Sequence, residues 1–207
     1  MLGLSLSFDD LDTTDWVRYP ERCEQGIEAL ASACGMEPKL EVERFVWCRE
    51  RLGRRTQVTK SDVLTHRLTG VVTKNLPLVF EFVLTMADSG VRGFAYLTQG
   101  RPGATLPDNL AGLLDGTLHA HLETGGDPRE GALLADLFRI AFPNLEGLKH
   151  HSPLAQGMIV GVVPCGSRIR LKVYFNTRLD PSGSHAKRVA AMLSRCGLED
   201  RGLYESL

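Results

Sequence analysis

The segment 168–178, RIRLKVYFNTR, alternates between polar and apolar residues along its whole length. Successive side chains of a β-strand point to opposite faces, so the alternation predicts a strand with two unlike faces. One face is apolar. The other carries four cations, a tyrosine and an amide: Arg168, Arg170, Lys172, Tyr174, Asn176 and Arg178. Two interpretations stay open, the wetted face of an antiparallel sheet and the lining of an anion pocket. The absence of any acid and the central tyrosine favour the pocket.

Two hairpins are predicted by the same period of two. Over 76–86 one face carries Phe80, Phe82, Leu84 and Met86, and 91–98 is the return strand after the turn-forming stretch 88–90, Asp-Ser-Gly. Residues 154–163 form the next predicted strand, which a short turn connects to the strand 168–178. Each hairpin is therefore expected to contribute two neighbouring antiparallel strands.

Helices are predicted where apolar residues recur every three or four positions. This spacing indicates helices over 20–34, 107–123, 128–142 and 184–197. The segment 39–58 fits both periods, and we favour a strand over 40–48. Because hairpins alternate with helices, the order disfavours a parallel doubly wound sheet and favours an antiparallel sheet with helices packed on one face.

Composition bounds the class of protein. A chain of 207 residues suits one domain, 1–207, in which 1–19 are expected to form a flexible tail or docking arm. The 24 basic and 25 acidic residues nearly cancel, so the sequence gives no general attraction to nucleic acid or to an anionic membrane. An anion site must then be local.

The cysteines and the start of the chain indicate a cytoplasmic protein. The five cysteines are odd in number and lack zinc-type spacing, so we expect reduced thiols. The first residues lack the basic region of a signal peptide, and no apolar run approaches the length of roughly 18 residues that spans a bilayer. His119 and His121 stand two apart on a predicted helix and so do not share a face. No metal site is predicted, and no nucleotide-binding or hydrolase motif is present in the sequence.

Three segments together resemble a known family. They are THRLTGVVTKNLPLVFEFVL at 65–84, SGVRGFAYL at 89–97 and RIRLKVYF at 168–175, and the predicted helix around 107–118 fits the same pattern. Their order and spacing resemble the ABBA aromatic prenyltransferases, most closely the indole (dimethylallyltryptophan synthase) type. The resemblance covers about 65–180. It implies an α+β fold in which an antiparallel sheet curls into a barrel or half barrel with the helices outside.

The resemblance also implies an activity and a set of site residues. Members of the family transfer a prenyl group from an allylic diphosphate to an aromatic ring, usually without a metal, and no cofactor is expected. Glu81 matches the glutamate that accepts a hydrogen bond from the indole N–H, and Tyr174 matches a tyrosine that shields the allylic cation. The implied substrate-binding residues, of which the first two hold the diphosphate, are Arg92, Lys172, Arg170, Tyr96 and Arg168.

This chemistry accounts for the residues of the cationic strand. Ionisation of an allylic diphosphate leaves pyrophosphate, which several fixed cations stabilise. Aromatic faces stabilise the carbocation and exclude water from it. A carboxylate that polarises the ring N–H makes the attacking carbon richer in electrons. The alternative for Glu81 is a residue at the rim of the sheet, or a partner of Arg92.

The length of the chain leaves several functions open. It supplies about one and a half of the family's helix–strand–strand–helix units, and a half barrel has open sheet edges that proteins cover or pair. We therefore expect a homodimer, or a partner protein that completes the barrel. The acceptor is an aromatic small molecule or a peptide. The alternatives are a non-catalytic barrel-like accessory protein in natural-product biosynthesis that binds a ligand or partner, and an unrelated α+β phosphate-binding protein.

Overall fold

The computed structural model describes residues 19–52, 81–87, 90–98, 105–151, 157–165 and 168–198. The helices are α1 (Tyr19–Ala33), α2 (Pro38–Leu52), α4 (Leu106–Glu123), α5 (Pro128–Ala141) and α6 (His185–Arg195), with a short 3-10 helix, η2 (Leu145–His150). The strands are β1 (Glu81–Ala87), β2 (Gly90–Thr98), β3 (Met158–Cys165) and β4 (Arg168–Phe175).

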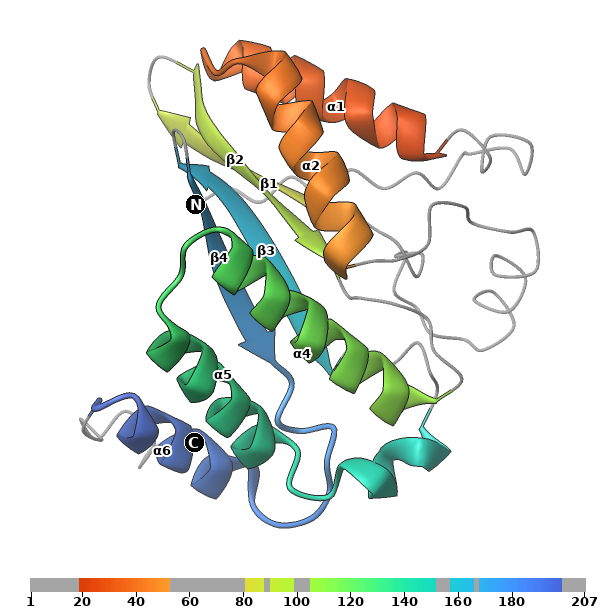
Figure 1. Cartoon of the computed structure of the whole chain (residues 1–207). Coiled ribbons are helices and arrows are strands. Elements are labelled where there is room, and N and C mark those ends of the chain that lie inside the picture. The colour runs from red at the N-terminus through yellow and green to blue at the C-terminus, as the bar shows by residue number, and fades with distance from the viewer. Residues whose placement is uncertain are drawn as a thin grey trace.

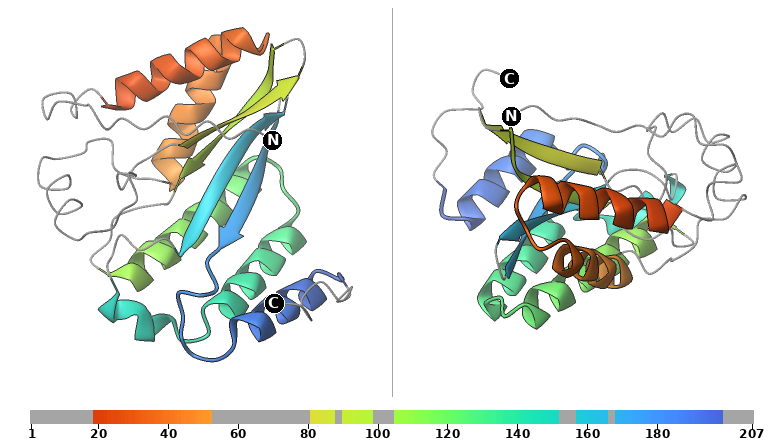
Figure 2. Two further views of the ribbon diagram at one scale, coloured as in Figure 1. Left: turned by 180° about the vertical axis from the view of Figure 1, so that it is seen from behind. Right: turned by 90° about the horizontal axis from the view of Figure 1, so that it is seen from above.

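The strands form one small antiparallel sheet in the order β1-β2-β3-β4. Two hairpins make up this sheet, and they join through a short β2–β3 ladder of three paired positions, Tyr96–Thr98 with Val160–Val162. Figures 1 and 2 show helices α2 and α4 on one face of the sheet, and the view from behind shows β3 and β4 in front of α4.

The prediction of a barrel or half barrel is wrong. Within the described ranges the sheet has four strands and ends at β1 on one side and β4 on the other. It is neither closed nor curled into a barrel, and the chain is rich in helix. A barrel whose interior holds side chains or one small ligand has about eight strands. Two hairpins that meet over three positions are too few to enclose such an interior.

The strand favoured over residues 40–48 is also wrong, because this segment lies in helix α2. The residues that α2 buries are spaced by four, three and four positions: Glu41, Phe45, Cys48 and Leu52. This is the helical period, and it places the buried residues along one stripe against α1 and α4. The alternation read in the sequence came from Leu40 and Val42, which are exposed or half-buried.

The other predicted elements that fall on described residues are confirmed. Helices α1, α4, α5 and α6 and strands β2 and β3 begin and end within a few residues of the predicted positions. Strand β4 ends at Phe175, three residues earlier than expected. The first residues of the 76–86 strand, two of the turn residues between 88 and 90, and most of the arm 1–19 lie outside the described residues.

Local sequence signals fix where α4 and α5 begin. Thr105 accepts a hydrogen bond from the backbone N–H of Asp108, and the Asp108 carboxylate accepts one from the backbone N–H of Thr105. This capping box satisfies two backbone donors that the first turn would leave free. Asp127 caps α5 by accepting from the N–H of Arg129, and Pro128 occupies the first turn.

Helix α4 lies at the centre of the core. Leu113 of α4, Phe45 of α2 and Val160 of β3 are completely buried. Gly116 lets α2 and α4 approach closely, because a Cβ atom at this position would overlap the backbone carbonyl of Arg51. The helical face of the sheet is therefore packed to the point where a single methyl group matters.

A buried arginine ties α6 to the segment that follows β4. Arg188 is 7% exposed, and its guanidinium donates to the backbone carbonyls of Thr177, Asp180 and Ser182. The Asp180 carboxylate accepts hydrogen bonds from the backbone N–H of Asn144 and from Ser182. Most of these interactions satisfy backbone groups of the turn after β4, so the cluster stabilises the fold.

Candidate anion-binding face of the sheet

Strand β4 carries the predicted cations on its exposed face. Arg168, Arg170 and Lys172 are exposed, and Tyr174 is 49% exposed. The intervening residues are half-buried: Ile169, Leu171, Val173 and Phe175. The prediction of a strand with two unlike faces is confirmed. Asn176 and Arg178 lie beyond the end of the strand.

The neighbouring strand adds no charge to this face. The cations Arg168, Arg170 and Lys172 pair with Cys165, Val163 and Gly161 of β3, and Tyr174 pairs with Ile159. Laterally paired residues lie on the same face of a sheet. No described acidic side chain forms an ion pair with the three cations. The three cations therefore lie beside an uncharged strip and have no ion-pair partner among the described residues.

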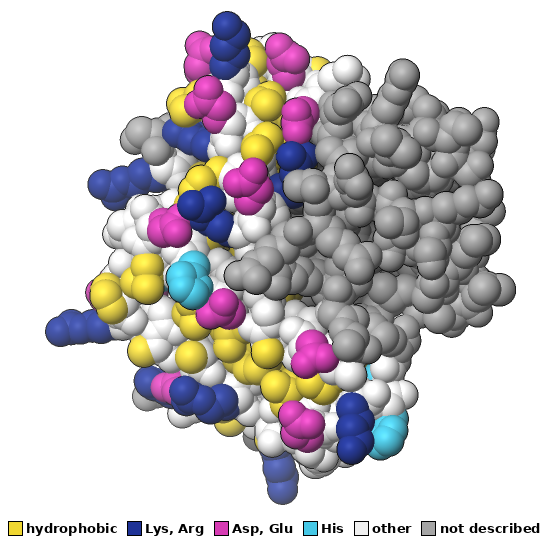
Figure 3. Space-filling view, turned by 45° about the vertical axis from the view of Figure 1, so that its right-hand side comes forward, with side chains coloured by type: hydrophobic (Ala, Val, Ile, Leu, Met, Phe, Trp, Pro, Cys, Tyr) yellow, Lys and Arg dark blue, Asp and Glu magenta, His cyan; other side chains and the backbone are white. Residues whose placement is uncertain are grey.

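The remainder of the visible surface is different. Figure 3 shows the helical side of the molecule, where acidic and basic side chains are intermingled with hydrophobic ones. Arg195 and Arg139 both pair with Asp136, for example, and these ion pairs lower the pKa of that carboxyl. On this side of the molecule cations and acids are thus mixed, unlike on the exposed face of β4.

The backbone register relates Glu81 to Lys172. Glu81 pairs with Leu97, Leu97 pairs with Gly161, and Gly161 pairs with Lys172. The two residues therefore occupy the same lateral row of the sheet, three strands apart, which corresponds to about 14 Å between their backbones. The side chain of Glu81 lies outside the described residues, so its role stays a prediction.

Arg92 and Tyr96 occupy other positions of the register. Tyr96 pairs with Val162, and Val162 pairs with Leu171. Tyr96 is therefore in the set of laterally paired positions next to the set that contains Lys172. Arg92 lies at a β-bulge, where Thr85 pairs with Gly93 and Met86 pairs with Val91. It stands five positions along β2 from the row of Lys172, about 17 Å away along the strand. The side chains of Arg92 and Tyr96 lie outside the described residues, and their roles stay predictions.

The structure brings Arg168, Arg170, Lys172 and Tyr174 together on one exposed face. It does not enclose them, because the barrel interior in which they were expected is absent from the described part of the chain. In this arrangement the cations can bind an anion that approaches from solvent. Exclusion of water from that anion would require a further protein surface over the sheet.

A cavity on the helical side of β4 was not predicted from the sequence. It measures about 720 Å³ and lies between β4 and the end of α4, the turn after it and the start of α5. Its apolar wall includes Leu134, Leu171 and Val173, and its polar lining includes His121 and Glu130. The half-burial of alternate β4 residues is the only trace that such a cavity leaves in the sequence.

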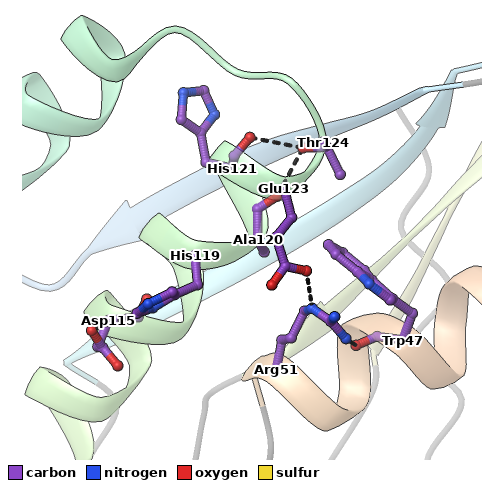
Figure 4. Close-up of polar contacts among 8 residues, drawn as sticks. All are labelled: Trp47, Arg51, Asp115, His119, Ala120, His121, Glu123 and Thr124. Atoms are coloured by element: carbon purple, nitrogen blue, oxygen red, sulfur yellow. Dashed lines mark hydrogen bonds and ion pairs between the residues drawn. The ribbon is translucent and has the colours of Figure 1, made fainter.

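The two histidines of α4 point in different directions, as predicted (Figure 4). A ring nitrogen of His119 lies 2.9 Å from the carbonyl of Asp115. His121 bridges the end of α4 to the start of α5, with Nε2 2.9 Å from the carbonyl of Asp127 and 3.4 Å from a Glu130 carboxylate oxygen. Among the described residues no cluster of three or more metal-ligating side chains occurs.

A salt bridge connects α2 to α4, and its arginine lies over an aromatic ring of α2 (Figure 4). The Arg51 guanidinium lies over the Trp47 ring, 4.2 Å from its centroid, and forms an ion pair with Glu123. Cation–π contacts of this kind contribute about 0.5–2 kcal/mol. Trp47 also lines a second cavity of about 310 Å³, together with Leu40 and Arg168. This smaller cavity shares Thr124, Arg168 and Ile169 with the larger one, so the two are neighbours.

One buried carboxyl pairs with Arg44, a residue of the smaller cavity, without lining that cavity itself. Glu41 is 3% exposed, and burial raises the pKa of its carboxyl, an effect that the charge and hydrogen bond of Arg44 partly offset. The other carboxylate oxygen, Oε2, has no hydrogen-bond partner. Glu41 belongs to the packing of α2 and touches neither site.

Comparisons with known proteins identify no relative: no family model matches, and neither a curated protein nor a solved structure matches. None of the helices in the described ranges combines the length and the apolar character needed to cross a bilayer. A function for this chain therefore depends on its own geometry and on the resemblance of its strands.

Proposed function

We propose that the open face of the sheet binds the diphosphate of an allylic donor, and that the chain serves aromatic prenyl transfer once a second protein surface covers this face. The observation that carries the proposal is the row Arg168, Arg170 and Lys172, exposed, without an acid and beside the uncharged β3 strip. Its cations fit a diphosphate, and the strip fits a hydrocarbon chain.

The reaction that this site would serve has few protein-dependent steps. The bond between the allylic carbon and the diphosphate oxygen breaks, and its electron pair leaves with pyrophosphate. The aromatic ring attacks the allylic cation, and the ring then loses a proton. The cations stabilise the leaving pyrophosphate. Tyr174 lies on the same face of β4 as the three cations, where its ring stabilises the allylic cation. Glu81 is proposed to polarise an indole N–H.

A cover is part of the proposal, because an allylic cation in contact with water is hydrolysed. The cover is a second copy of the chain or another protein. The four described cysteines, Cys34, Cys48, Cys165 and Cys196, are free, which favours a reducing compartment such as the cytoplasm. The acceptor is an aromatic small molecule or a peptide side chain.

Calorimetric titration with dimethylallyl diphosphate tests the binding step. We expect Lys172→Ala and Arg170→Ala each to weaken binding about tenfold, since each removes one charge-assisted contact. Lys187→Ala and Arg129→Ala are matched controls, because both residues are exposed on helices away from the row. Unchanged affinity in both β4 variants would refute the site.

A second candidate function is a non-catalytic accessory protein that binds an anionic ligand or partner. The exposure of the whole row favours it, since no described element shields the bound anion. Incubation with dimethylallyl diphosphate and tryptophan, followed by mass spectrometry, separates the two candidates. A product heavier by one prenyl unit supports transfer. Tight donor binding without product, at protein concentrations where the chain self-associates, supports the accessory role.

A further inference from the structure

The outer edge of β4 is open in the described part of the chain. All eight residues of β4 pair with β3, and no described strand pairs with the opposite edge. In an antiparallel ladder the backbone N–H and C=O groups of a strand point alternately toward its two neighbours. Within the described ranges, strand β4 therefore presents unpaired backbone groups on its outer edge, which can template another strand.

A groove runs along this edge. The larger cavity is lined by the consecutive residues 168–171 and by Val173. Consecutive strand residues point to opposite faces, so a cavity that touches all of them follows the edge of the strand. Its other wall includes Gly131 and Leu134 of α5 and the turn that follows α4, with His121, Asp127 and Glu130 as its polar lining. Figure 1 shows this turn passing close to the start of β4.

The groove extends beyond the start of β4 toward α2. The smaller cavity adjoins the larger at Thr124 and Arg168 and is walled by Leu40 and Trp47. Leu40 is 40% exposed, so its side chain is accessible to a ligand in this cavity. An extended segment that lies along β4 can therefore place one large apolar side chain against Trp47 at its end.

The two faces of β4 define the composition of such a segment. On the open face, Arg168, Arg170 and Lys172 select acidic residues, because opposite charges on paired strands stabilise a sheet. On the groove side, the half-buried Leu171 and Val173 select apolar residues. A second β4 strand is a poor occupant, because antiparallel self-pairing would bring cations of two copies onto neighbouring positions of one face.

We propose that β4 is a docking edge for an extended segment of a partner protein in which acidic residues alternate with apolar ones. The segment adds to the sheet as a fifth strand, with its acids over the cationic row and its apolar residues in the groove. This goes beyond donor binding, because it uses the strand edge and the helical side of β4, which the anion site does not. The two ligands share the cations and so compete.

Fluorescence anisotropy with a labelled ten-residue peptide of alternating glutamate and valine tests this interaction. A peptide of the same composition with its glutamates grouped keeps the charge and loses the alternation. We expect the alternating peptide to bind at least tenfold more tightly. Equal affinity of the two peptides would refute strand addition and leave only charge attraction.

Leu134→Glu distinguishes the groove from the anion site. It places an acid in the groove wall without changing any β4 residue, and Ala132→Glu adds the same charge at an exposed position of the same helix. We expect Leu134→Glu to weaken binding of the alternating peptide at least tenfold. Ala132→Glu should leave that affinity unchanged. Dimethylallyl diphosphate binding should be the same in both variants. A folded Leu134→Glu protein that binds the peptide normally would overturn the docking site while leaving the anion site intact.

A charge exchange provides a second test that does not depend on the stability of Leu134→Glu. The double variant Arg170→Glu, Lys172→Glu should no longer bind the glutamate peptide. It should instead bind a peptide of alternating lysine and valine. Failure to exchange preference in the folded variant would contradict the proposed register. Sedimentation velocity of the natural chain tests the remaining occupant. Dimerisation that Leu134→Glu abolishes and Ala132→Glu does not would assign the groove to a second copy.

Discussion

The two sides of the sheet contrast in how their side chains are satisfied. On the helical side, apolar residues are fully buried, a glycine permits close helix contact, and the polar groups around Arg188 are hydrogen-bonded. On the open side, three cations of β4 are exposed and pair with no described acid. The helical side is organised for stability, whereas the charges of the open side contribute little to it. Substitutions on the two sides should therefore affect different measurements.

Substitution of two aromatic residues, one on each side of the sheet, should give the largest difference in the free energy of unfolding. Phe45 is completely buried between α2 and the rest of the core, whereas Tyr174 is 49% exposed on β4. Phe45→Ala should lower the free energy of unfolding by about 3–5 kcal/mol, through lost burial and the cavity left behind. Tyr174→Ala should lower it by about 1 kcal/mol or less. Urea denaturation followed by circular dichroism measures both, and similar losses in the two variants would contradict the contrast.

Two glycines of α4 sharpen the comparison within one helix. A Cβ at Gly116 would overlap the Arg51 carbonyl, whereas a Cβ at Gly112 would meet no atom within 4 Å. Gly116→Ala should therefore destabilise the protein by about 1–3 kcal/mol through overpacking. Gly112→Ala should stabilise it by up to about 1 kcal/mol, because alanine favours the helix. The same denaturation experiment measures both, and a stabilising Gly116→Ala would show that the α2–α4 contact is loose.

How far the sequence predicts this molecule depends on which signal each segment carries. Strand β4 was predicted correctly because its alternation is continuous and its two faces differ in charge as well as in polarity. Helix α2 was missed because Leu40 and Val42 simulate a period of two, while the stripe that includes Phe45 and Leu52 is buried where α2 packs against α1 and α4. Tertiary packing decides such ambiguous segments.

Only the part of the candidate site that lies within one strand was predictable from the sequence. The cationic row is a property of one strand, so its sequence alone revealed it. Closure of the sheet and the groove beside β4 depend on where α4 and α5 lie, and no local pattern encodes that position. The register that relates Glu81 to Lys172 likewise passes through Leu97 and Gly161, which belong to two different hairpins.

The Asp180 carboxyl adds a pH dependence that belongs to the helical side. Burial raises the pKa of this group, but hydrogen bonds from Ser182 and Asn144 and the charge of Arg188 outweigh burial and hold the pKa below its ordinary value. The unfolded chain then binds more protons than the native one, so stability is present above about pH 3.9 and is lost as the pH falls through the native pKa.

Asp180→Asn tests this assignment. The amide would present an N–H group to the backbone N–H of Asn144 or to Ser182, so we expect a loss of about 1–3 kcal/mol at pH 7. The difference from the natural chain should shrink as the pH falls below about 3.9, because the carboxyl of the unfolded natural chain then binds a proton and the native carboxyl follows at a lower pH. Thermal unfolding between pH 3 and pH 7 measures the difference, and a constant difference across this range would contradict the assigned pKa direction.

The smallest expected effect comes from the cations of the open side. Arg170→Ala and Lys172→Ala remove exposed charges that have no ion-pair partner among the described residues, so each should change the free energy of unfolding by less than about 0.5 kcal/mol. Because the row consists of like charges, its members repel one another, and either variant should be slightly more stable than the natural chain at low ionic strength. Added salt should remove that gain, since about 0.1 M salt screens charges beyond about 10 Å. A clear loss of stability in either variant would mean that the cation is paired in the folded protein, and the open face would then lack the free charge on which anion binding and strand docking both depend.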